Sequence, residues 1–279
     1  MVKLIVDSGA TKAEWCLLME KGKKKTFFTQ GISPYFLNKD QIIDLLKKKV
    51  LPKLKNATID EIHYYGTGCA NIENATLVKT SLQAALGKIN IKINHDLTAA
   101  ARALCGHEKG VACILGTGSG SCFYNGKKIA KISTGLGYVL GDEGSGAFLG
   151  KKVLQHYLYN IFEEELMAKF DTKFATSKNE ILEYIYKKPL PNRYMASYSM
   201  FLAENRGHYM IENIIEDGLN EFFFQHLLRI NEIWKTKVHF VGAVAFGFKD
   251  VLKELCNSYG FELGSVLKNP MQGLVTYHQ

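Results

Sequence analysis

The sequence predicts an α/β protein built from two similar domains. Short apolar segments of strand length alternate with segments that carry apolar residues at helical spacing, which is typical of layered α/β folds. The two halves also open alike, because Leu4–Asp7 and Val111–Leu115 are each followed by a glycine and hydroxyl turn and a second strand. This weak repeat indicates one β-hairpin start per domain, and we expect both turns to point into a cleft between the domains.

The first half alternates strands and helices. Its second strand covers Glu14–Met19 and turns at the basic tip Gly22-Lys23-Lys24. A helix is predicted over Asp40–Leu51, with Asp40 as its N-cap and Pro52 just after its end. The remaining predicted elements are a strand at Glu61–Tyr65, a helix at Asn74–Leu86 closed by Gly87, a strand at Ile89–Asn94 and a helix at Thr98–Leu104.

The second half begins as a hairpin and becomes helical after Gly150. Its second strand, Cys122–Tyr124, leads into Asn125-Gly126, the strongest short signal for a hairpin turn. No Pro/Ser-rich linker is present, so we expect domains 1–108 and 109–279, joined by a short hinge near 105–112, with a helical insertion in the second. The later predicted elements are helices at Val153–Ala168, Lys178–Tyr186, Arg193–Glu204, Met210–Ile233 and Asp250–Tyr259, and a strand at Lys237–Val241.

The composition argues against several classes of protein. A hydrophobic content of 47% over 279 residues is ordinary for a globular chain. No apolar run approaches the roughly 18 residues of a membrane span, and we expect no signal peptide. The six cysteines include no C-x-x-C pair, so we expect reduced, packed thiols in a cytoplasmic protein. The net charge of +8 comes from short lysine clusters without interleaved aromatics, so nucleic acid is not an expected partner.

Two turns at strand ends have the chemistry to hold a polyphosphate. In the first, Asp7-Ser8-Gly9-Ala10-Thr11-Lys12, the carboxylate could hold magnesium through water, glycine admits an anion, and lysine adds positive charge. The second, Gly116-Thr117-Gly118-Ser119, offers backbone N–H groups and two hydroxyls. Neither turn is a P-loop or a dinucleotide fingerprint. Each alone is more readily an ordinary turn, but their matching places in the repeat favour binding.

Three further segments carry candidate site residues. Asp96 leaves a strand and enters a helix, where it is either a base for a hydroxyl or an N-cap. Asp142 and Glu143 lie in a turn with more glycine than a helix start tolerates, which leaves the carboxylates free for sugar hydroxyls. Gly242-Ala243 ends a late strand, where small residues admit an adenine ring or close helix–strand packing. No Cys/His array indicates a metal site. The order of these motifs indicates an ATP-dependent sugar kinase.

The ordered motifs resemble the N-acetylglucosamine kinase-like, BadF/BadG-type branch of the acetate kinase, sugar kinase, Hsp70 and actin superfamily. The resemblance covers nearly the whole chain, from Asp7–Lys12 through His95-Asp96 and Gly141–Gly146 to Pro270-Met271-Gln272-Gly273-Leu274. It implies two ribonuclease-H-like domains of the actin-like ATPase type that close over ATP and Mg²⁺. The sequence departs from the family at Gly120, where asparagine is frequent, and in the spacing of Asn38 from Gly31.

The resemblance also implies roles for individual residues. Asp96 would be the base that activates the sugar 6-hydroxyl, and Asp7 the magnesium residue. The residues expected at the nucleotide are Ser8, Gly9, Ala10, Thr11, Lys12, Gly116, Thr117, Gly118, Ser119, Gly242 and Ala243. Those expected at the sugar are Asn38, Asp96, Thr117, Gly137, Asp142 and Glu143.

The sequence therefore predicts a kinase that phosphorylates the 6-hydroxyl of an amino sugar: N-acetylglucosamine, N-acetylmuramate or glucosamine. One alternative is the activator ATPase of the same superfamily, whose iron–sulfur cluster needs close cysteines that this chain lacks. Another is a non-catalytic sugar or nucleotide sensor, which would not need Asp7, Asp96 and Asp142. The zinc-bearing repressor and kinase family is excluded by its missing cysteine cluster. The particular sugar and the oligomeric state, with a homodimer as one option, are left open.

Overall fold

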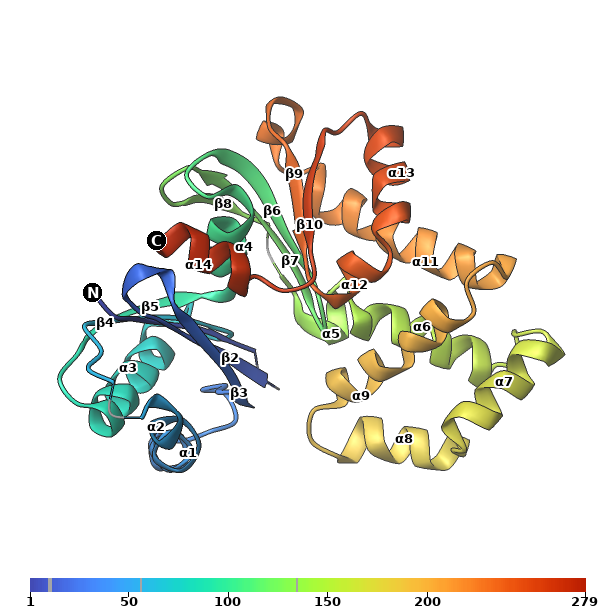
Figure 1. The fold of residues 1–279 in the computed structure, drawn as a ribbon. Coiled ribbons are helices and arrows are strands. Elements are labelled where there is room, and N and C mark those ends of the chain that lie inside the picture. Colours follow the sequence, from blue (N-terminus) through green and yellow to red (C-terminus); the bar gives the residue numbers. More distant parts are fainter. Residues whose placement is uncertain (10–11, 56, 134) are drawn as a thin grey trace. The chain divides into compact units, whose positions relative to one another are not determined.

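The computed structural model describes residues 1–9, 12–55, 57–133 and 135–279. The chain forms two compact units (Figure 1): Met1–His107 together with Asn269–Gln279, and Glu108–Lys268. The first break lies inside the expected hinge at 105–112. Residues 269–279, which the sequence analysis placed in the C-terminal domain, belong instead to the first unit.

The first unit contains a five-stranded sheet in the order β3-β2-β1-β4-β5. The first three strands pair antiparallel, whereas β1, β4 and β5 run parallel, so their carboxyl ends meet at one edge. There, Ser8 pairs with Gly66 and Gly66 pairs with His95. The strands are β1 (Lys3–Ser8), β2 (Lys12–Leu18), β3 (Lys24–Gln30), β4 (Glu61–Gly66) and β5 (Asn90–His95).

Helices cover both faces of this sheet, because successive side chains of a strand point to opposite sides. Leu4 and Val6 pack in the cluster with the first group of helices, and Ile5 packs in the cluster with the second group. The first group comprises α1 (Lys39–Leu45), the π-helical turn η2 (Leu46–Val50), α2 (Leu51–Leu54) and α3 (Ile72–Leu86); the second comprises α4 (Asp96–Cys105) and α14 (Met271–His278). A short 3₁₀ turn, η1 (Glu20–Gly22), precedes β3.

Two details of this unit differ from the sequence prediction. The N-cap of α1 is Asn38 rather than Asp40, and Pro52 lies in the first turn of α2 rather than beyond the helix. The motif at 270–274 has a packing reason, because a Cβ on Gly273 would lie 2.2 Å from the carbonyl oxygen of Ala103. Glycine therefore lets α14 cross α4 at close range.

The second unit repeats the strand order of the first. Its sheet has the order β10-β9-β6-β7-β8, with β6, β9 and β10 parallel and β6, β7 and β8 antiparallel. The expected hairpin turns at Asn125, whose side chain accepts from the backbone N–H groups of Lys127 and Lys128. The strands are β6 (Lys109–Leu115), β7 (Ser119–Asn125), β8 (Ile129–Ile132), β9 (Val238–Val241) and β10 (Leu263–Leu267). The duplicated hairpin start is confirmed.

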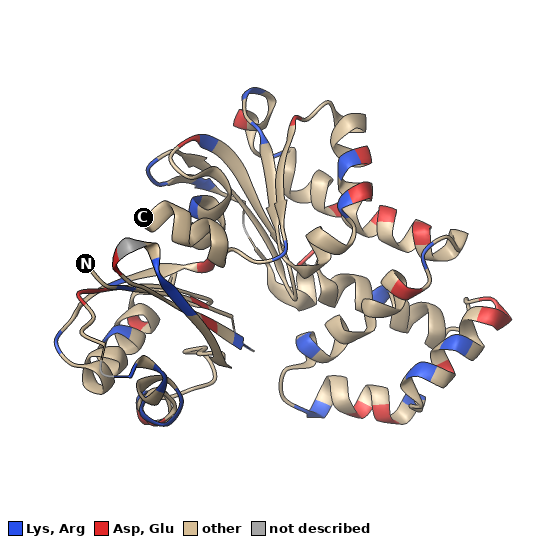
Figure 2. Ribbon diagram, in the orientation of Figure 1, with Lys and Arg blue, Asp and Glu red and all other residues tan. Residues whose placement is uncertain are grey.

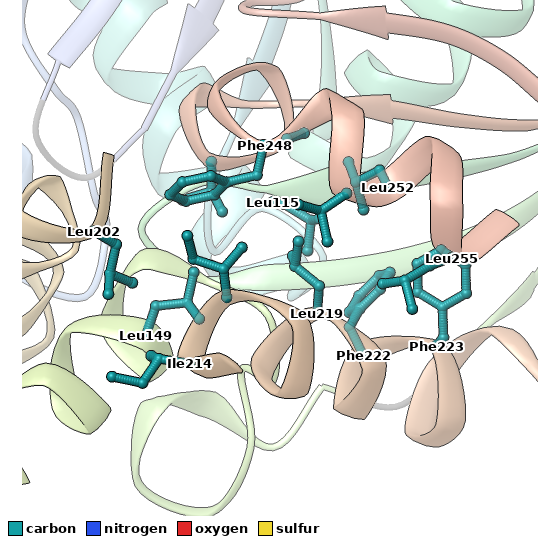
Figure 3. Close-up of a cluster of buried hydrophobic side chains, with 14 of the residues drawn as sticks. Leu115, Leu149, Leu202, Ile214, Leu219, Phe222, Phe223, Phe248, Leu252 and Leu255 are labelled. Carbon is teal, nitrogen blue, oxygen red and sulfur yellow. The ribbon is translucent and has the colours of Figure 1, made fainter. Parts of the chain in front are cut away.

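The helices of the second unit surround an apolar core. Leu115, Leu149, Phe222 and Leu252 bring together β6, α6, α11 and α13 (Figure 3). The helices are α5 (Gly137–Leu140), α6 (Gly146–Leu158), α7 (Glu164–Phe174), α8 (Lys178–Lys187), α9 (Pro191–Tyr198), α10 (Met200–Glu204), α11 (Tyr209–Phe222), α12 (Ala243–Gly247) and α13 (Lys249–Tyr259); a π-helical turn η3 (Phe223–Leu227) and a 3₁₀ turn η4 (Asn231–Lys235) follow α11.

The predicted single helix at Val153–Ala168 is wrong. The chain leaves α6 after Leu158 and starts α7 at Glu164. Between them Asn160 has a φ of 55°, in the left-handed region that asparagine tolerates and that ends helices. A helical spacing of apolar residues continues through this break, which is why the pattern alone did not reveal it.

The surface and the thiols agree with the composition. Lysine and arginine are distributed over many elements (Figure 2). All six cysteines are buried, as predicted. Among the described residues, no helix combines the length and the apolar character that crossing a bilayer requires.

Candidate active site

The first set of candidate residues lies where the parallel strands of the first unit end. Asp7 is the second-last residue of β1, and Asp96 directly follows β5 as the first residue of α4. Burial, followed by the negative charges of Asp96 and Glu14, raises the pKa of Asp7 to about 7. Such electrostatic influence requires neighbouring carboxylates. The ends of β1 and β5 flank the end of β4, so Asp7 and Asp96 lie at the same edge of the sheet.

Asp96 is not the N-cap of α4. That position belongs to His95, whose side chain makes no capping bond. Asp96 Oδ1 accepts from the N–H of Leu97 at 2.8 Å, and His95 Nδ1 lies 3.8 Å from the same oxygen. The Asp96 side chain is 46% exposed, so its carboxylate is open to a substrate hydroxyl. The prediction that Asp96 is the N-cap of α4 is therefore wrong.

The first candidate phosphate turn is described only in part. The N–H of Gly9 donates to the carbonyl of Lys12 at 3.0 Å. Ser8 is buried, and its hydroxyl oxygen accepts from the N–H of Ile32 at 2.9 Å. The Lys12 ammonium lies 3.6 Å from the centre of the Phe28 ring. Ala10 and Thr11, also predicted at the nucleotide, lie outside the described residues.

Asn38, predicted at the sugar, has a structural role. Its side-chain oxygen accepts from the N–H of Gln41, and the Gln41 side chain accepts from the N–H of Asn38, both at 3.0 Å. This reciprocal pair is a capping box at the start of α1. Capping is a sufficient physical reason for asparagine here, and a sugar contact stays a prediction.

In the second unit, the Gly116–Ser119 turn packs against the start of α6. The N–H of Gly116 donates to the carbonyl of Gly118 at 3.0 Å, which closes the turn. The N–H groups of Gly146 and Ala147 then donate to the carbonyls of Gly116 and Thr117, at 2.8 and 3.1 Å. The predicted second phosphate turn and the predicted acidic turn are therefore one hydrogen-bonded corner.

The carboxylate of Asp142 lies at this corner. The N–H of Ser119 donates to Asp142 Oδ1 at 3.4 Å, and a Cβ on Gly118 would lie 3.0 Å from Asp142 Oδ2. Burial raises the pKa of Asp142, while the bond from Ser119 lowers it. Ser119 Oγ is buried and has no hydrogen-bond partner among the described residues. A buried hydroxyl without a partner is costly, so this atom is a plausible ligand contact.

Several glycines around the acidic turn have packing reasons rather than ligand reasons. A Cβ on Gly144 would lie 2.8 Å from the Cβ of Phe222, and one on Gly150 would lie 1.8 Å from the carbonyl oxygen of Met195. The sequence analysis had attributed this glycine content to a ligand crowding the helix. Gly144 and Gly150 instead allow the start of α6 to pack closely against neighbouring helices.

Gly242 lies at the end of β9, next to the end of β6. Its φ is 131°, and a Cβ would lie 2.1 Å from the carbonyl oxygen of Leu115. Parallel pairing of Ile114 with Val241 brings these strand ends together, and Ala243 starts α12. The close approach alone requires glycine, so the adenosine contact of Gly242 and Ala243 stays a prediction.

The other residues predicted at the sugar differ in their surroundings. Gly137 has a φ of 72° and begins the exposed helix α5. Glu143 does not share the contacts of its neighbour Asp142, because its Oε2 lies 2.9 Å from Nε2 of the buried His226. The sequence analysis missed His226, since its partner is 83 positions away and no local pattern links them.

The residues at the end of β1 fit a magnesium ion. The described part of the chain holds no group of three or more His, Cys, Asp or Glu that could enclose a metal. Mg²⁺ usually keeps several waters and takes one or two carboxylates together with phosphates. Asp7 with its neighbour Asp96 matches that donor set, because two mutually repelling carboxylates favour a divalent cation.

Comparison with known proteins places these observations in a family. No family model matches the chain. It is 30% identical over 168 residues to the N-acetyl-D-glucosamine kinase of Dictyostelium discoideum, a match that covers 55% of this chain and 53% of that protein. It therefore spans about half the length of this curated relative.

Two solved structures cover the whole chain. One, from Porphyromonas gingivalis and provisionally assigned as an N-acetylglucosamine kinase, has a TM-score of 0.94 at 37% identity and covers 99% of this chain and 98% of that one. Another with the same provisional assignment, from Chromobacterium violaceum, has a TM-score of 0.78 at 15% identity over 100% and 99% of the two chains and shows the fold alone.

The repeated sheet order and these neighbours define an α/β protein of the actin-like ATPase fold that sugar kinases adopt. The chain belongs to the N-acetylglucosamine kinase-like family, since it covers 98% of the Porphyromonas gingivalis relative at 37% identity. The family and fold expected from the sequence motifs are confirmed.

Proposed function

We propose that this chain transfers the terminal phosphoryl group of ATP to the 6-hydroxyl of an amino sugar, with N-acetylglucosamine as the first candidate. The observation that carries the proposal is the open carboxylate of Asp96 beside the buried Asp7, at the carboxyl ends of parallel strands. Ligands of open α/β sheets bind at such ends. The names of the relatives support the choice of sugar.

Asp96 acts as the base in this proposal. Its carboxylate accepts the proton of the sugar 6-hydroxyl as that oxygen attacks the terminal phosphorus. The hydrogen bond from Leu97 orients one carboxylate oxygen and leaves the side chain accessible. Asp7 holds Mg²⁺ directly or through water, and the ion supplies positive charge for the phosphates when it is bound.

Residues of the second unit bind the phosphates and the sugar. Backbone N–H groups of the Gly116–Ser119 turn and the unpartnered hydroxyl of Ser119 are donors suited to phosphate oxygens. The carboxylate of Asp142, held next to this turn, accepts hydrogen bonds from sugar hydroxyls.

A coupled assay of ADP release over a panel of sugars tests the proposal. The panel contains N-acetylglucosamine, N-acetylmuramate, glucosamine and glucose, each with Mg²⁺-ATP, and ³¹P NMR identifies the product. We expect one amino sugar to stimulate ADP release and to yield a 6-phosphate. The proposal would be contradicted if no sugar changed the rate of ADP release, or if no ADP were released with any sugar.

The activator ATPase remains the weaker alternative. An iron–sulfur cluster shared between subunits needs cysteines at the surface, and all six cysteines of this chain are buried. The same buried cysteines suit a reducing compartment, so we propose a cytoplasmic location. A homodimer is the oligomeric state to test first, by sedimentation of the purified protein.

A further inference from the structure

A chain of three hydrogen-bonded side chains ends on the acidic turn of the second unit. Ser133 Oγ lies 2.9 Å from His226 Nδ1, and His226 Nε2 lies 2.9 Å from Glu143 Oε2. His226 is 4% exposed and Ser133 9% exposed. The three residues come from the segment after β8, the π-helical turn η3 and the turn before α6.

The chemistry of Glu143 fixes the direction of its bond to His226. A carboxylate only accepts hydrogen bonds, so Nε2 of His226 carries a proton and donates to Glu143. The hydroxyl of Ser133 can donate to Nδ1 or accept from it, so it holds the other side of the ring. Each side chain thereby orients the next, from Ser133 through His226 to Glu143.

The ring of His226 is held rigidly, whereas Glu143 borders open space. Phe222 stacks on the imidazole with ring centres 4.9 Å apart, and His226 lies in a π-helical turn, a feature frequent at functional sites. A cavity of about 500 Å³ is lined by Ser133, His226 and Glu143 together with Leu136 and Arg229. The position of the Glu143 carboxylate is therefore not set by packing alone, and the hydrogen bond from His226 fixes it.

The acidic turn needs such an anchor because its backbone is unusual. Asp142 has a φ of 56°, a left-handed conformation that costs a non-glycine residue roughly 1 kcal/mol. Gly144 also has a positive φ, of 70°, and passes close to Phe222. Asp142 and Glu143 are adjacent, so a change in the position of one carboxylate moves the other.

We propose that His226 is a positioning residue for sugar binding. By holding Glu143 it fixes the acidic turn and keeps the carboxylate of Asp142 at the Gly116–Ser119 turn. In this proposal Glu143 acts on the sugar through Asp142 rather than by direct contact. The inference rests on the proposed function, because it assigns Asp142 to the sugar.

Two variants of His226 each keep only one of its two hydrogen bonds. The side-chain amide of His226→Gln reaches the position of Nε2 and keeps the donor to Glu143, whereas that of His226→Asn reaches the position of Nδ1 and faces Ser133. We expect His226→Asn to raise the KM for the sugar at least about tenfold, the effect of losing a hydrogen bond to a charged group. His226→Gln should stay within about threefold.

Hydrogen exchange provides a readout that does not depend on turnover. The N–H groups of Ser145, Gly146 and Ala147 donate to Asp142, Gly116 and Thr117, so they report on the order of the turn. They should exchange faster in His226→Asn than in His226→Gln. Equal exchange and equal KM values in the two variants would overturn the positioning role. If the exchange rates of the two variants differ but the unaltered protein phosphorylates no sugar, the proposed function alone would be overturned.

Discussion

The two units have one strand order but different chemistry at their strand ends. In the first unit, the ends of β1 and β5 carry the carboxylates of Asp7 and Asp96. In the second, the end of β6, which corresponds to β1, carries the Gly116–Ser119 turn, and the end of β9, which corresponds to β4, carries Gly242. The comparison teaches that a repeated sheet fixes where side chains emerge, while residue type sets the chemistry there: carboxylates in the first unit, and backbone N–H groups and small residues in the second.

The largest effect expected from this division is the loss of turnover in Asp96→Asn. The variant should lower kcat about 10³-fold, because a positioned base contributes 10²- to 10⁴-fold. Its stability should not change, since the asparagine oxygen can still accept from Leu97. Steady-state kinetics and thermal unfolding measure the two effects.

Two other variants sharpen this result. Asp142→Asn should act mainly on the KM for the sugar, because Asp142 belongs to the binding half. Asp44→Asn, which breaks an exposed ion pair with Lys48, should alter neither quantity. The proposed roles of Asp96 as base and Asp142 as sugar contact would be contradicted by either of two results. One is a kcat in Asp96→Asn close to that of the unaltered protein, and the other is an equal loss of kcat in Asp142→Asn.

The units differ also in how a sheet face is covered. In the first unit, α14 places the buried His278 next to β4. His278 Nε2 lies 2.8 Å from the hydroxyl of Tyr65, which also accepts from Arg102, and the imidazole ring centre lies 3.8 Å from that of His63. Burial, together with the positive charges of His63, Arg102 and Lys3, lowers the pKa of His278 to about 3, and the negative charge of Glu61 opposes these effects.

The first unit should therefore lose stability in acid. Below pH 6.5 the unfolded chain binds a proton at position 278 that the folded unit binds only near pH 3, so stability present above pH 6.5 is lost across this window. The loss is on the order of 4 kcal/mol. Denaturant unfolding followed by the fluorescence of buried Trp15, in a Trp234→Phe background, measures it in this unit. His278→Gln should flatten the pH dependence; an unchanged slope would show that other groups cause it.

A smaller effect is expected at the strand ends of the second unit. Gly242→Ala should cost on the order of 3 kcal/mol, because its Cβ would overlap the Leu115 carbonyl at a positive φ. Gly247→Ala is the matched control, since its Cβ would meet nothing within 4 Å. Unfolding in denaturant compares the two. Similar stabilities would mean that β6 and β9 separate easily at this edge.

The smallest expected effect concerns Asn38. Asn38→Ala should lose about 1 kcal/mol through its cap, whereas Asn38→Asp should keep it. If Asn38 also contacts the sugar, both variants should raise the KM for the sugar. If the alanine variant loses stability and neither variant changes the KM for the sugar, Asn38 acts only as a helix cap.

The sequence predicted the elements whose signal is local. Leu4–Asp7 and Val111–Leu115 are buried strands that end in turn residues, so both the strands and their neighbouring candidate residues were recognised. The edge strands β3, β8 and β10 were missed because few of their residues are buried: β3 buries one and β8 and β10 bury none, so none of them shows a clear apolar pattern.

Relationships across long stretches of sequence were beyond prediction for a different reason. His226 contacts Glu143 across 83 positions, and His278 contacts Tyr65 across 213. No periodicity encodes such pairs. The neighbouring carboxylates of Asp7 and Asp96 could be anticipated, because each follows a strand and parallel strands end at one edge.

The position of α14 has a consequence for synthesis. Residues 271–278 emerge from the ribosome after the whole of the second unit, yet they complete the sheet face that contains Ile5 and Tyr65. The first unit therefore cannot complete this face until the chain of the second unit has been synthesised.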